Sequence, residues 1–415
     1  MTKIGIAVLA CVCVVLVAVP AAGDPVDDLF DQARVHEVRI TMAAADWAQL
    51  RATYLQNTNY DATLTFDGET VANSSIRSRG SGTRNGVKPG LRVDFNRKVK
   101  TQTFRGFKTL VLDNMYNDPS LLREQLAFAV FGEMGITVPR EAFARLTVNG
   151  EYWGLYAIVE PVDKIFVTRH VDGGQGNLFE YNVPPLPPSG QLQAWDFALS
   201  RGATIDGYVP SPFEPKTNED SLDGTALLAF LRTISEEPEA TFVDAISRFV
   251  DPHVLLTYYA VEIATAEVDG LTSYFGVNNF YLYQLEGTQR FQFIPWDHDF
   301  NFTTADQLIY FGAERNRLIQ RLVNDRDLRA FYRSTLQSVL TQYVNPGWMA
   351  PRIDGMAALI REAVLQDTKR RGGDDPSTSA QTFDDAVAHV RQVVAGRGAS
   401  VTSQLASVRR RSAGH

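Results

Sequence analysis

The segment Phe291-Gln-Phe-Ile-Pro-Trp-Asp-His-Asp-Phe-Asn-Phe302 is the strongest indication of the fold in this sequence. An apolar strand ends at Pro295-Trp296, and two carboxylates, Asp297 and Asp299, follow between aromatic residues. Two carboxylates one residue apart at the end of a buried strand repel each other unless a cation or a basic group neutralises them. Magnesium suits this arrangement because it takes oxygen ligands, usually one or two carboxylates together with substrate phosphates. The alternative is a loop in which the acids cap a turn and His298 lies on the surface.

A second polar segment precedes this strand. Asp269 follows an apolar helix expected over residues 252–267, and Asn278 and Asn279 directly precede an apolar strand. Phosphoryl-transfer sites contain the same order of parts: an Asp, an Asn about ten residues later, then a strand, a tight turn and another acid. In such sites one Asp orients the acceptor hydroxyl, while the Asn and the later Asp hold the metal. The alternative is that Asp269-Gly270 only ends a helix and that the asparagines are turn residues.

A third segment is the glycine- and hydroxyl-rich loop Arg77-Ser-Arg-Gly-Ser-Gly-Thr-Arg-Asn-Gly-Val-Lys88 between two expected strands. The backbone amides of such a loop can bind anionic oxygens, and Arg79, Arg84 and Lys88 add positive charge for phosphates. The loop does not match the Walker pattern, so it is not a P-loop. Hairpin loops are also rich in glycine for conformational reasons alone.

The composition is that of a globular protein. The 415 residues are 45% hydrophobic and 21% charged, which supports a large core and excludes a disordered chain. The net charge of -8 argues against a nucleic-acid partner. Of the six histidines only His298 lies in the acidic cluster, which weakens a metal-dependent hydrolase, and a Ser-His-Asp hydrolase would need a Gly-x-Ser-x-Gly motif that the sequence lacks.

The N-terminus predicts export. Lys3 precedes an apolar run over residues 4–19, and small residues up to Gly23 follow it, which is typical of a signal peptide spanning residues 1–23. The alternatives are an uncleaved anchor and a lipoprotein signal ending at Cys11. Both cysteines, Cys11 and Cys13, lie in this segment, so the mature chain would contain no disulfide. No later segment is apolar enough to span a membrane, and we expect a secreted or cell-surface protein.

The rest of the chain predicts an α+β fold. Residues 24–160 read as a strand-rich part with one helix, which Asp118-Pro119 opens and Gly135 closes. Residues 161–345 are mainly helical, with a hairpin before Asp297, and residues 346–415 form a helical extension. The strands are expected from alternation and turn signals at 38–41, 62–66, 71–79, 91–96, 107–112, 143–148 and 154–159.

These motifs together resemble the CotH kinase family, the secreted or spore-coat atypical protein kinases. The resemblance covers about residues 35–302, in family order. Besides the glycine loop it rests on the motifs Leu122-Arg-Glu124, Tyr152-Trp-Gly-Leu-Tyr156 to Glu160, Gly176-Asn-Leu-Phe-Glu180, Asn279-Phe-Tyr-Leu-Tyr283 and Pro295-Trp-Asp-His-Asp299.

The resemblance implies a two-lobed atypical protein-kinase-like fold, with residues 24–160 as the N-lobe and 161–345 as the C-lobe. It implies that Lys88 binds phosphate with Glu124 as its acidic partner, and that Asp269 orients the acceptor. The other implied roles are metal binding by Asn279, Asp297 and Asp299, and cofactor binding by Arg79, Gly80, Ser81, Thr83, Arg84 and, near the adenine at the connection between the lobes, Glu160.

The implied function is a secreted protein kinase that transfers phosphate from ATP, with Mg2+ or Mn2+, to a Ser or Thr of an extracytoplasmic or cell-surface protein. The alternative is a non-catalytic, kinase-like surface or adhesion protein. Export favours the alternative because ATP is scarce outside cells. The retained acids favour the enzyme, since a protein without catalysis has no physical need for clustered carboxylates.

Overall fold

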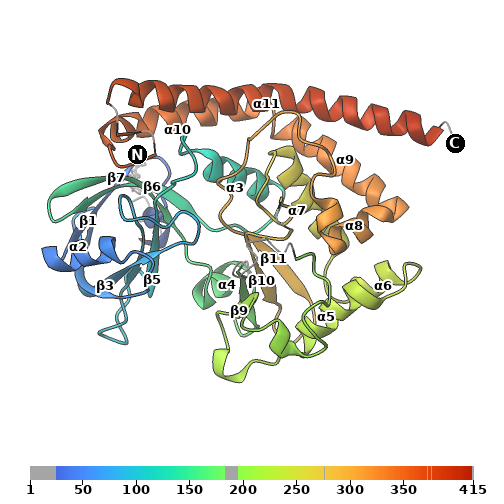
Figure 1. Ribbon diagram of the computed structural model, residues 1–415, viewed down its shortest axis with the longest axis horizontal. Coiled ribbons are helices and arrows are strands. Elements are labelled where there is room, and N and C mark those ends of the chain that lie inside the picture. Colours follow the sequence, from blue (N-terminus) through green and yellow to red (C-terminus); the bar gives the residue numbers. More distant parts are fainter. Residues whose placement is uncertain (1–24, 183–194, 275, 372, 375, 414–415) are drawn as a thin grey trace, which may run out of the picture.

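The computed structural model describes residues 25–182, 195–274, 276–371, 373–374 and 376–413. It is a mixed α+β fold in which a β-barrel and a helix-rich region lie side by side under two long helices, α10 and α11 (Figure 1). The predicted signal peptide over residues 1–23 lies outside the described residues. Within the described part of the chain, no helix is both long and apolar enough to cross a membrane.

The N-terminal half forms a closed barrel of seven strands in the order β1-β2-β3-β4-β5-β7-β6. Neighbouring strands are antiparallel except β1 and β6, which close the barrel in parallel. All seven predicted strands are confirmed, and the barrel core contains mainly their alternate apolar residues. The strands are β1 (His36–Thr41), β2 (Tyr60–Phe66), β3 (Glu69–Arg79), β4 (Gly90–Asp94), β5 (Thr109–Asp113), β6 (Glu141–Val148) and β7 (Glu151–Val159).

The prediction of a single helix in this half is wrong. The short helices α1 (Pro25–Leu29) and α2 (Ala44–Ala52) are also present. Helix α2 buries only Trp47 and Leu50, and Trp47 meets Trp153 edge-on at 4.8 Å between ring centroids. Its first residue has no side-chain cap, so neither capping nor a long apolar stripe marks it in the sequence. Packing on the barrel stabilises this helix.

The predicted helix after Asp118 is α3 (Arg123–Glu133), which begins later than expected. Leu121 has a φ of 59°, which interrupts helical geometry. The Asp118 carboxylate instead accepts hydrogen bonds from the backbone amides of Leu122 and Arg123 at 2.7 and 2.8 Å. Helix α3 is buried on two sides, as its sequence predicts, and it packs on α7 and α10.

The helix-rich region contains a four-stranded sheet in the order β11-β10-β8-β9. The predicted hairpin is confirmed as β10 (Phe280–Gln284) and β11 (Phe291–Pro295), and β8 (Leu178–Tyr181) and β9 (Phe213–Pro215) extend it. The helices are α4 (Lys164–His170), α5 (Thr225–Glu236), α6 (Phe242–Ile246), α7 (Pro252–Ala264), α8 (Arg317–Asn324) and α9 (Arg326–Gln342), with 3-10 turns η1 (Ile205–Gly207), η2 (Glu219–Ser221) and η3 (Ala313–Arg315).

The C-terminal helices α10 (Pro346–Gln366) and α11 (Pro376–Ala413) belong to the same core as the rest of this region. Helix α10 touches β7 of the barrel as well as α3 and α11, and α11 crosses the top of Figure 1. Arg397 of α11 is fully buried and donates hydrogen bonds to the carbonyl oxygens of Ile263, Ala305 and Gln307. The extension therefore supports the end of α7 and the loop that follows Asp299.

Candidate active site

The candidate site lies where three chain segments meet: the segment after α7, the start of β10 and the end of β11. Left-handed backbone positions shape all three, at Ala266 (φ 57°), Asn279 (φ 52°) and Asp297 (φ 56°). A left-handed φ is uncommon in residues other than glycine and clusters at functional sites, where the surrounding structure must hold it.

Hydrogen bonds join these segments through Asn279. Its amide nitrogen donates to the carboxylate of Asp269 at 3.2 Å, to the carbonyl oxygen of Asp269 at 2.9 Å and to the carbonyl oxygen of Asp297 at 3.1 Å. The Asn278 amide donates to the other carboxylate oxygen of Asp269 at 3.1 Å. Asp269, Asn279 and Asp297, which the sequence predicts to act together, are therefore brought together. Asn279 holds two segments, whereas Asn278 orients only Asp269.

The carboxylates of this group carry more negative charge than the fold neutralises. Burial, together with the negative charge of Asp113, raises the pKa of Asp297 to about 7. Burial and the nearby Glu267 raise the pKa of Asp269 to about 6. The pKa of Asp299 is also raised, by burial and then by Asp297. In the described part of the chain, neither Asp297 nor Asp299 has a hydrogen bond or an ion pair to its carboxylate.

Glu124 lies in the same cluster and not beside Lys88. One of its carboxylate oxygens accepts a hydrogen bond from the backbone amide of His298 at 3.3 Å. Burial raises its pKa, and the charges of Glu141 and Asp297 add to this effect. The predicted pair of Lys88 with Glu124 is therefore wrong, and Glu124 of α3 adds to the negative potential around the end of β11.

A buried group of hydrogen-bonded polar side chains supports the loop after β11. His298 and Glu267 are fully buried or nearly so, and Nδ1 of His298 lies 3.2 Å from a carboxylate oxygen of Glu267. The Asn301 amide donates to the same Glu267 carboxylate at 2.5 Å and to the His298 carbonyl oxygen at 2.9 Å. Glu267 also accepts the backbone amide of Asp269 at 2.7 Å. Sequence reasoning missed Glu267, Asn301 and the burial of His298, although both polar residues flank the predicted motifs.

The cation that faces this cluster is Arg79, at the end of β3. Its guanidinium pairs with Asp113 at 2.8 Å and lies 5.6 Å from the centroid of the Trp296 ring. Burial alone would lower the pKa of Arg79, but Asp113 and Asp297 outweigh that effect and raise it. Sequence reasoning missed Asp113, which directly follows an apolar strand in the same way as Asp297 does.

Lys88 lies within the barrel side of the molecule and is fully buried. Its ammonium group donates to the Asp367 carboxylate at 2.7 Å and to the Leu155 carbonyl oxygen at 2.6 Å, and it lies 5.0 Å from the centre of the Tyr156 ring. Asp367 follows α10 and is 1% exposed. The C-terminal extension therefore supplies the carboxylate that neutralises this lysine.

Gly154 explains part of the Tyr-Trp-Gly-Leu-Tyr motif. Its φ is 120°, and a side chain at this position would place its Cβ 2.3 Å from the Asp367 carboxylate. The Asp367 carboxylate also accepts the backbone amide of Leu155 at 3.0 Å. Only glycine allows Asp367 to approach the strand this closely.

Some residues of the glycine loop are exposed, and others make hydrogen bonds within the fold. Gly80 is exposed with a φ of 107°, and Ser81 is exposed beside it. The carbonyl oxygen of Thr83 accepts the Asn85 amide at 2.9 Å. Arg84 folds back onto the end of β3 and the segment before β2, where it donates to Ser78 and to the carbonyl oxygen of Gln56, and burial and Arg79 lower its pKa. Arg79 is therefore the loop arginine that lies beside the acid cluster.

Glu160 lies at the end of β7, where the chain leaves the barrel, and it is fully buried. Its carboxylate pairs with Arg140 at 2.8 Å and with Nε2 of His170 at 3.1 Å. Burial acts to raise its pKa, but hydrogen bonds from His170 and Arg140 lower it overall. These partners make Glu160 a connecting residue between strand and helix, and any contact with adenine remains a prediction.

The oxygen groups of the cluster fit a divalent cation that is completed by a ligand. Among the described residues, no three His, Cys, Asp or Glu side chains converge as a metal site. The predicted set differs from such a site, because it combines the carboxylates of Asp297 and Asp299 with the amide oxygen of Asn279. Mg2+ is commonly bound by one or two carboxylates plus phosphate oxygens, so this donor set suits a metal that arrives with a nucleotide.

Comparison with known proteins identifies the family of this chain. A family model described as CotH kinase protein matches residues 76–401. The chain is 28% identical over 304 residues to the inner spore coat protein H of Bacillus subtilis, covering 71% of this chain and 79% of that protein. It is 23% identical over 262 residues to the invasin CotH7 of Rhizopus delemar, covering 60% of this chain and 40% of the invasin. The chain belongs to the CotH kinase protein family.

Proposed function

We propose that this protein is an ATP-dependent phosphotransferase that uses a divalent metal ion, Mg2+ or Mn2+, to phosphorylate a Ser or Thr of a protein acceptor. The observation that carries the proposal is the hydrogen-bonded group of Asp269, Asn279 and Asp297, with Asp299 beside it and too little positive charge around it. Excess carboxylate charge at this site has a ready explanation if a cation binds there.

In this proposal the barrel and the helix-rich region are the two lobes of a kinase-like fold, and the site lies between them. Asp269 accepts the proton of the acceptor hydroxyl, and Asn278 and Asn279 hold its carboxylate in place. Its raised pKa, about 6, leaves it ionised at neutral pH and a better base than an ordinary aspartate.

Asp297, Asp299 and the Asn279 amide oxygen would hold the metal. When bound, the metal ion would neutralise charge on the phosphates of ATP. Arg79 is the residue that we assign to the phosphates in place of Lys88, because it lies beside Asp297 while Lys88 is engaged by Asp367. Arginine suits this role since its planar guanidinium can bind two phosphate oxygens at once.

A second candidate function is a kinase-like surface or adhesion protein without catalysis. The buried pair of Lys88 and Asp367 favours it, because the lysine that the family resemblance assigns to phosphate is neutralised within the fold. The names of the relatives, a spore coat protein and an invasin, fit a surface location for either function. We propose that this chain also acts outside the cytoplasm, on an extracytoplasmic or cell-surface protein.

The test is incubation of the mature chain with labelled ATP and Mg2+ or Mn2+, alone and with candidate surface proteins, followed by mass spectrometry. Phosphate on Ser or Thr that disappears in Asp269→Asn supports the kinase. Transfer of the nucleotide in place of phosphate would contradict the kinase and show a different transferase activity. No transfer at all, with an intact fold, would support the non-catalytic protein.

A further inference from the structure

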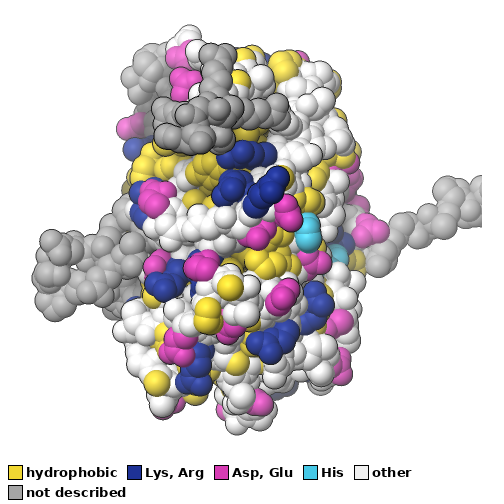
Figure 2. Space-filling model, turned by 90° about the vertical axis from the view of Figure 1, so that its right-hand side faces the viewer, with side chains coloured by type: hydrophobic (Ala, Val, Ile, Leu, Met, Phe, Trp, Pro, Cys, Tyr) yellow, Lys and Arg dark blue, Asp and Glu magenta, His cyan; other side chains and the backbone are white. Residues whose placement is uncertain are grey.

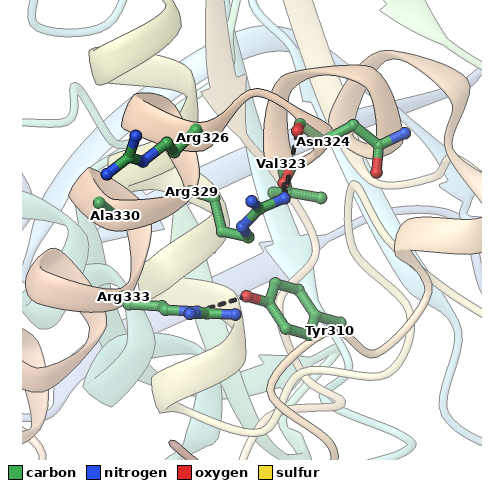
Figure 3. A pocket seen from close by; sticks show the side chains of 7 residues that line it. All are labelled: Tyr310, Val323, Asn324, Arg326, Arg329, Ala330 and Arg333. Carbon is green, nitrogen blue, oxygen red and sulfur yellow. Dashed lines mark hydrogen bonds between the residues drawn. The ribbon is translucent and has the colours of Figure 1, made fainter. Parts of the chain in front are cut away.

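A pocket of about 540 Å³ lies between α8, α9 and the segment that carries Tyr310 (Figure 3). It shares no residue with the acid cluster. Its lining consists of three arginines, one tyrosine, one asparagine and two small or apolar residues, namely Arg326, Arg329, Arg333, Tyr310, Asn324, Val323 and Ala330.

The three arginines share one face of α9. Arg326, Arg329 and Arg333 are spaced three and four residues apart, so successive turns of the helix place them above one another. Ala330 lies among them and its small side chain leaves room in front of the guanidinium groups. In Figure 3 the side chains of Arg329 and Arg333 reach from the helix toward Asn324 and Tyr310.

Internal contacts orient two of the three guanidinium groups but use only part of their hydrogen-bonding capacity. Nη1 of Arg329 donates to the carbonyl oxygens of Val323 and Asn324 at 3.2 and 3.1 Å. Nε of Arg333 donates to the Tyr310 hydroxyl at 2.8 Å. Arg326 is exposed, and its guanidinium group makes no hydrogen bond within the described part of the chain. Contacts of this kind hold a binding group in position before the ligand arrives.

The positive charge of the pocket has no acidic partner among the described residues. The acids on either side of Arg326 are Asp325 and Asp327. The Asp325 carboxylate accepts hydrogen bonds from the backbone amides of Asp327 and Leu328 at 2.9 Å and so caps α9, and Asp327 is exposed in the first turn of this helix. The neighbouring arginines Arg315 and Arg321 do have acidic partners, Glu314 and Glu239. Figure 2, which views the side of the molecule at the right of Figure 1, shows Lys and Arg side chains in several groups on this face, with Asp and Glu side chains among them. The three pocket arginines therefore differ from their neighbours in lacking a carboxylate.

We propose that this pocket binds the phosphate group of a phosphorylated peptide side chain. A phosphate monoester carries nearly two negative charges at neutral pH and three acceptor oxygens, which match several guanidinium donors better than a single carboxylate does. Arginine clusters are the usual means by which proteins recognise such groups. The volume exceeds what one phosphate ion fills, which leaves space for the peptide that carries it. The proposal goes beyond the phosphotransfer site and does not depend on it.

The test is fluorescence anisotropy with a labelled Gly/Ala peptide that contains one phosphoserine, without ATP or metal, and with inorganic phosphate as competitor. The parent protein binds the phosphopeptide at least about tenfold more tightly than the unphosphorylated peptide, since charge-assisted contacts are strong. Arg326→Ala weakens binding by about tenfold. Arg333→Lys keeps the charge but loses the planar guanidinium group and its paired N–H donors, and it weakens binding to a smaller extent.

The matched control is Arg290→Ala, which removes the same charge from an exposed position on the hairpin between β10 and β11. Unchanged affinity in this control supports a specific pocket, whereas an equal loss shows that only net charge attracts the peptide and overturns the proposal. Equal affinity for both peptides overturns it as well. Inorganic phosphate that binds as tightly as the phosphopeptide shows a site for the ion alone, which also contradicts a peptide site. Thermal melts of every variant confirm folding, and Arg326→Lys serves where Arg326→Ala is unstable.

Discussion

The end of β11 and the interior near Lys88 both contain buried charged groups. The fold pairs the charge of Lys88 with a group of opposite charge, whereas among the residues that the structure describes it leaves the acids at the end of β11 without such a partner. At the end of β11, burial and neighbouring carboxylates raise the pKa of both Asp297 and Asp299, and within the described residues their carboxylates accept no hydrogen bond. At Lys88, the ammonium group has a carboxylate and a carbonyl oxygen within 2.7 Å. Charge that the fold leaves unneutralised indicates a place for a ligand, while charge that the fold neutralises indicates a structural role.

In the acidic region near the end of β11, Asp269→Asn should have the largest effect on phosphotransfer. The substitution keeps the size and one acceptor of the side chain, but removes the charge that accepts the proton of the acceptor hydroxyl. We expect phosphotransfer to fall by about two to four decades, the usual range for a positioned acid or base. Transfer rates and nucleotide binding are measured together, with the exposed acid changed in Asp220→Asn as the control. Normal turnover in Asp269→Asn would leave this residue with only a structural role.

Lys88→Met tests the region around Lys88, where the fold neutralises the buried charge. The substitution leaves the Asp367 carboxylate buried without its cation, and breaking a buried pair in this way costs about 3–5 kcal/mol. The free energy of unfolding is measured with urea. Lys98→Met is the control, because Lys98 pairs with Asp61 at the surface, where such a pair contributes about 0–1 kcal/mol.

A double variant sharpens this second test. Lys88→Met combined with Asp367→Leu removes both charges, and we expect it to recover much of the lost stability. If Lys88→Met instead leaves stability unchanged and weakens ATP binding, Lys88 belongs to the nucleotide site, and the contrast between the two regions fails.

Asp297→Ala should abolish the stabilisation by magnesium and ATP. Binding at a hundred times the dissociation constant stabilises the native state by about 2.7 kcal/mol. We expect this gain in the parent and not in the variant, while the metal-free variant is as stable as the parent or more so, because one of the repelling charges is gone. Thermal melts with and without magnesium and ATP test this, with Asp220→Ala as control. A variant that loses metal-free stability and keeps its response to the ligand would make Asp297 a structural acid.

The smallest expected effect is a dependence of metal-free stability on pH. The native pKa of Asp297, about 7, lies above the ordinary value of 3.8, so the native state binds more protons than the unfolded state between these values. Stability from this group is therefore greatest below pH 4 and is lost as the pH rises toward 7.

Each unit of raised pKa corresponds to about 1.4 kcal/mol, and we expect a net loss of at least about this size between pH 5 and pH 7.5. Unfolding of the parent and of Asp297→Asn is compared at pH 5 and pH 7.5 without metal. The parent should lose more stability than the variant over this interval. Equal losses would show that Asp297 is not crowded by its neighbours.

Local signals explain which parts of the fold could be predicted. Alternation of apolar residues and turn pairs such as Asn149-Gly150 mark the seven barrel strands, because a strand shows its two faces within a few residues. Asp251 marks the start of α7, where its carboxylate accepts the backbone amides of His253 and Val254. The start of α3 could not be predicted, because the side chain of Asp118 caps a turn that the left-handed Leu121 separates from the helix.

Motifs and neighbours close along the chain were enough to predict the family, the strands of the barrel and the grouping of Asp269, Asn279 and Asp297. The three-dimensional structure was needed to show that Lys88 meets Asp367, which lies 279 residues away, and that Glu124 joins the acids. It also decided that Arg326, Arg329 and Arg333 share a pocket whose described lining holds no carboxylate. The physical reason is that the partner of a charge is set by packing between distant segments, and the spacing of residues along the chain carries no record of it.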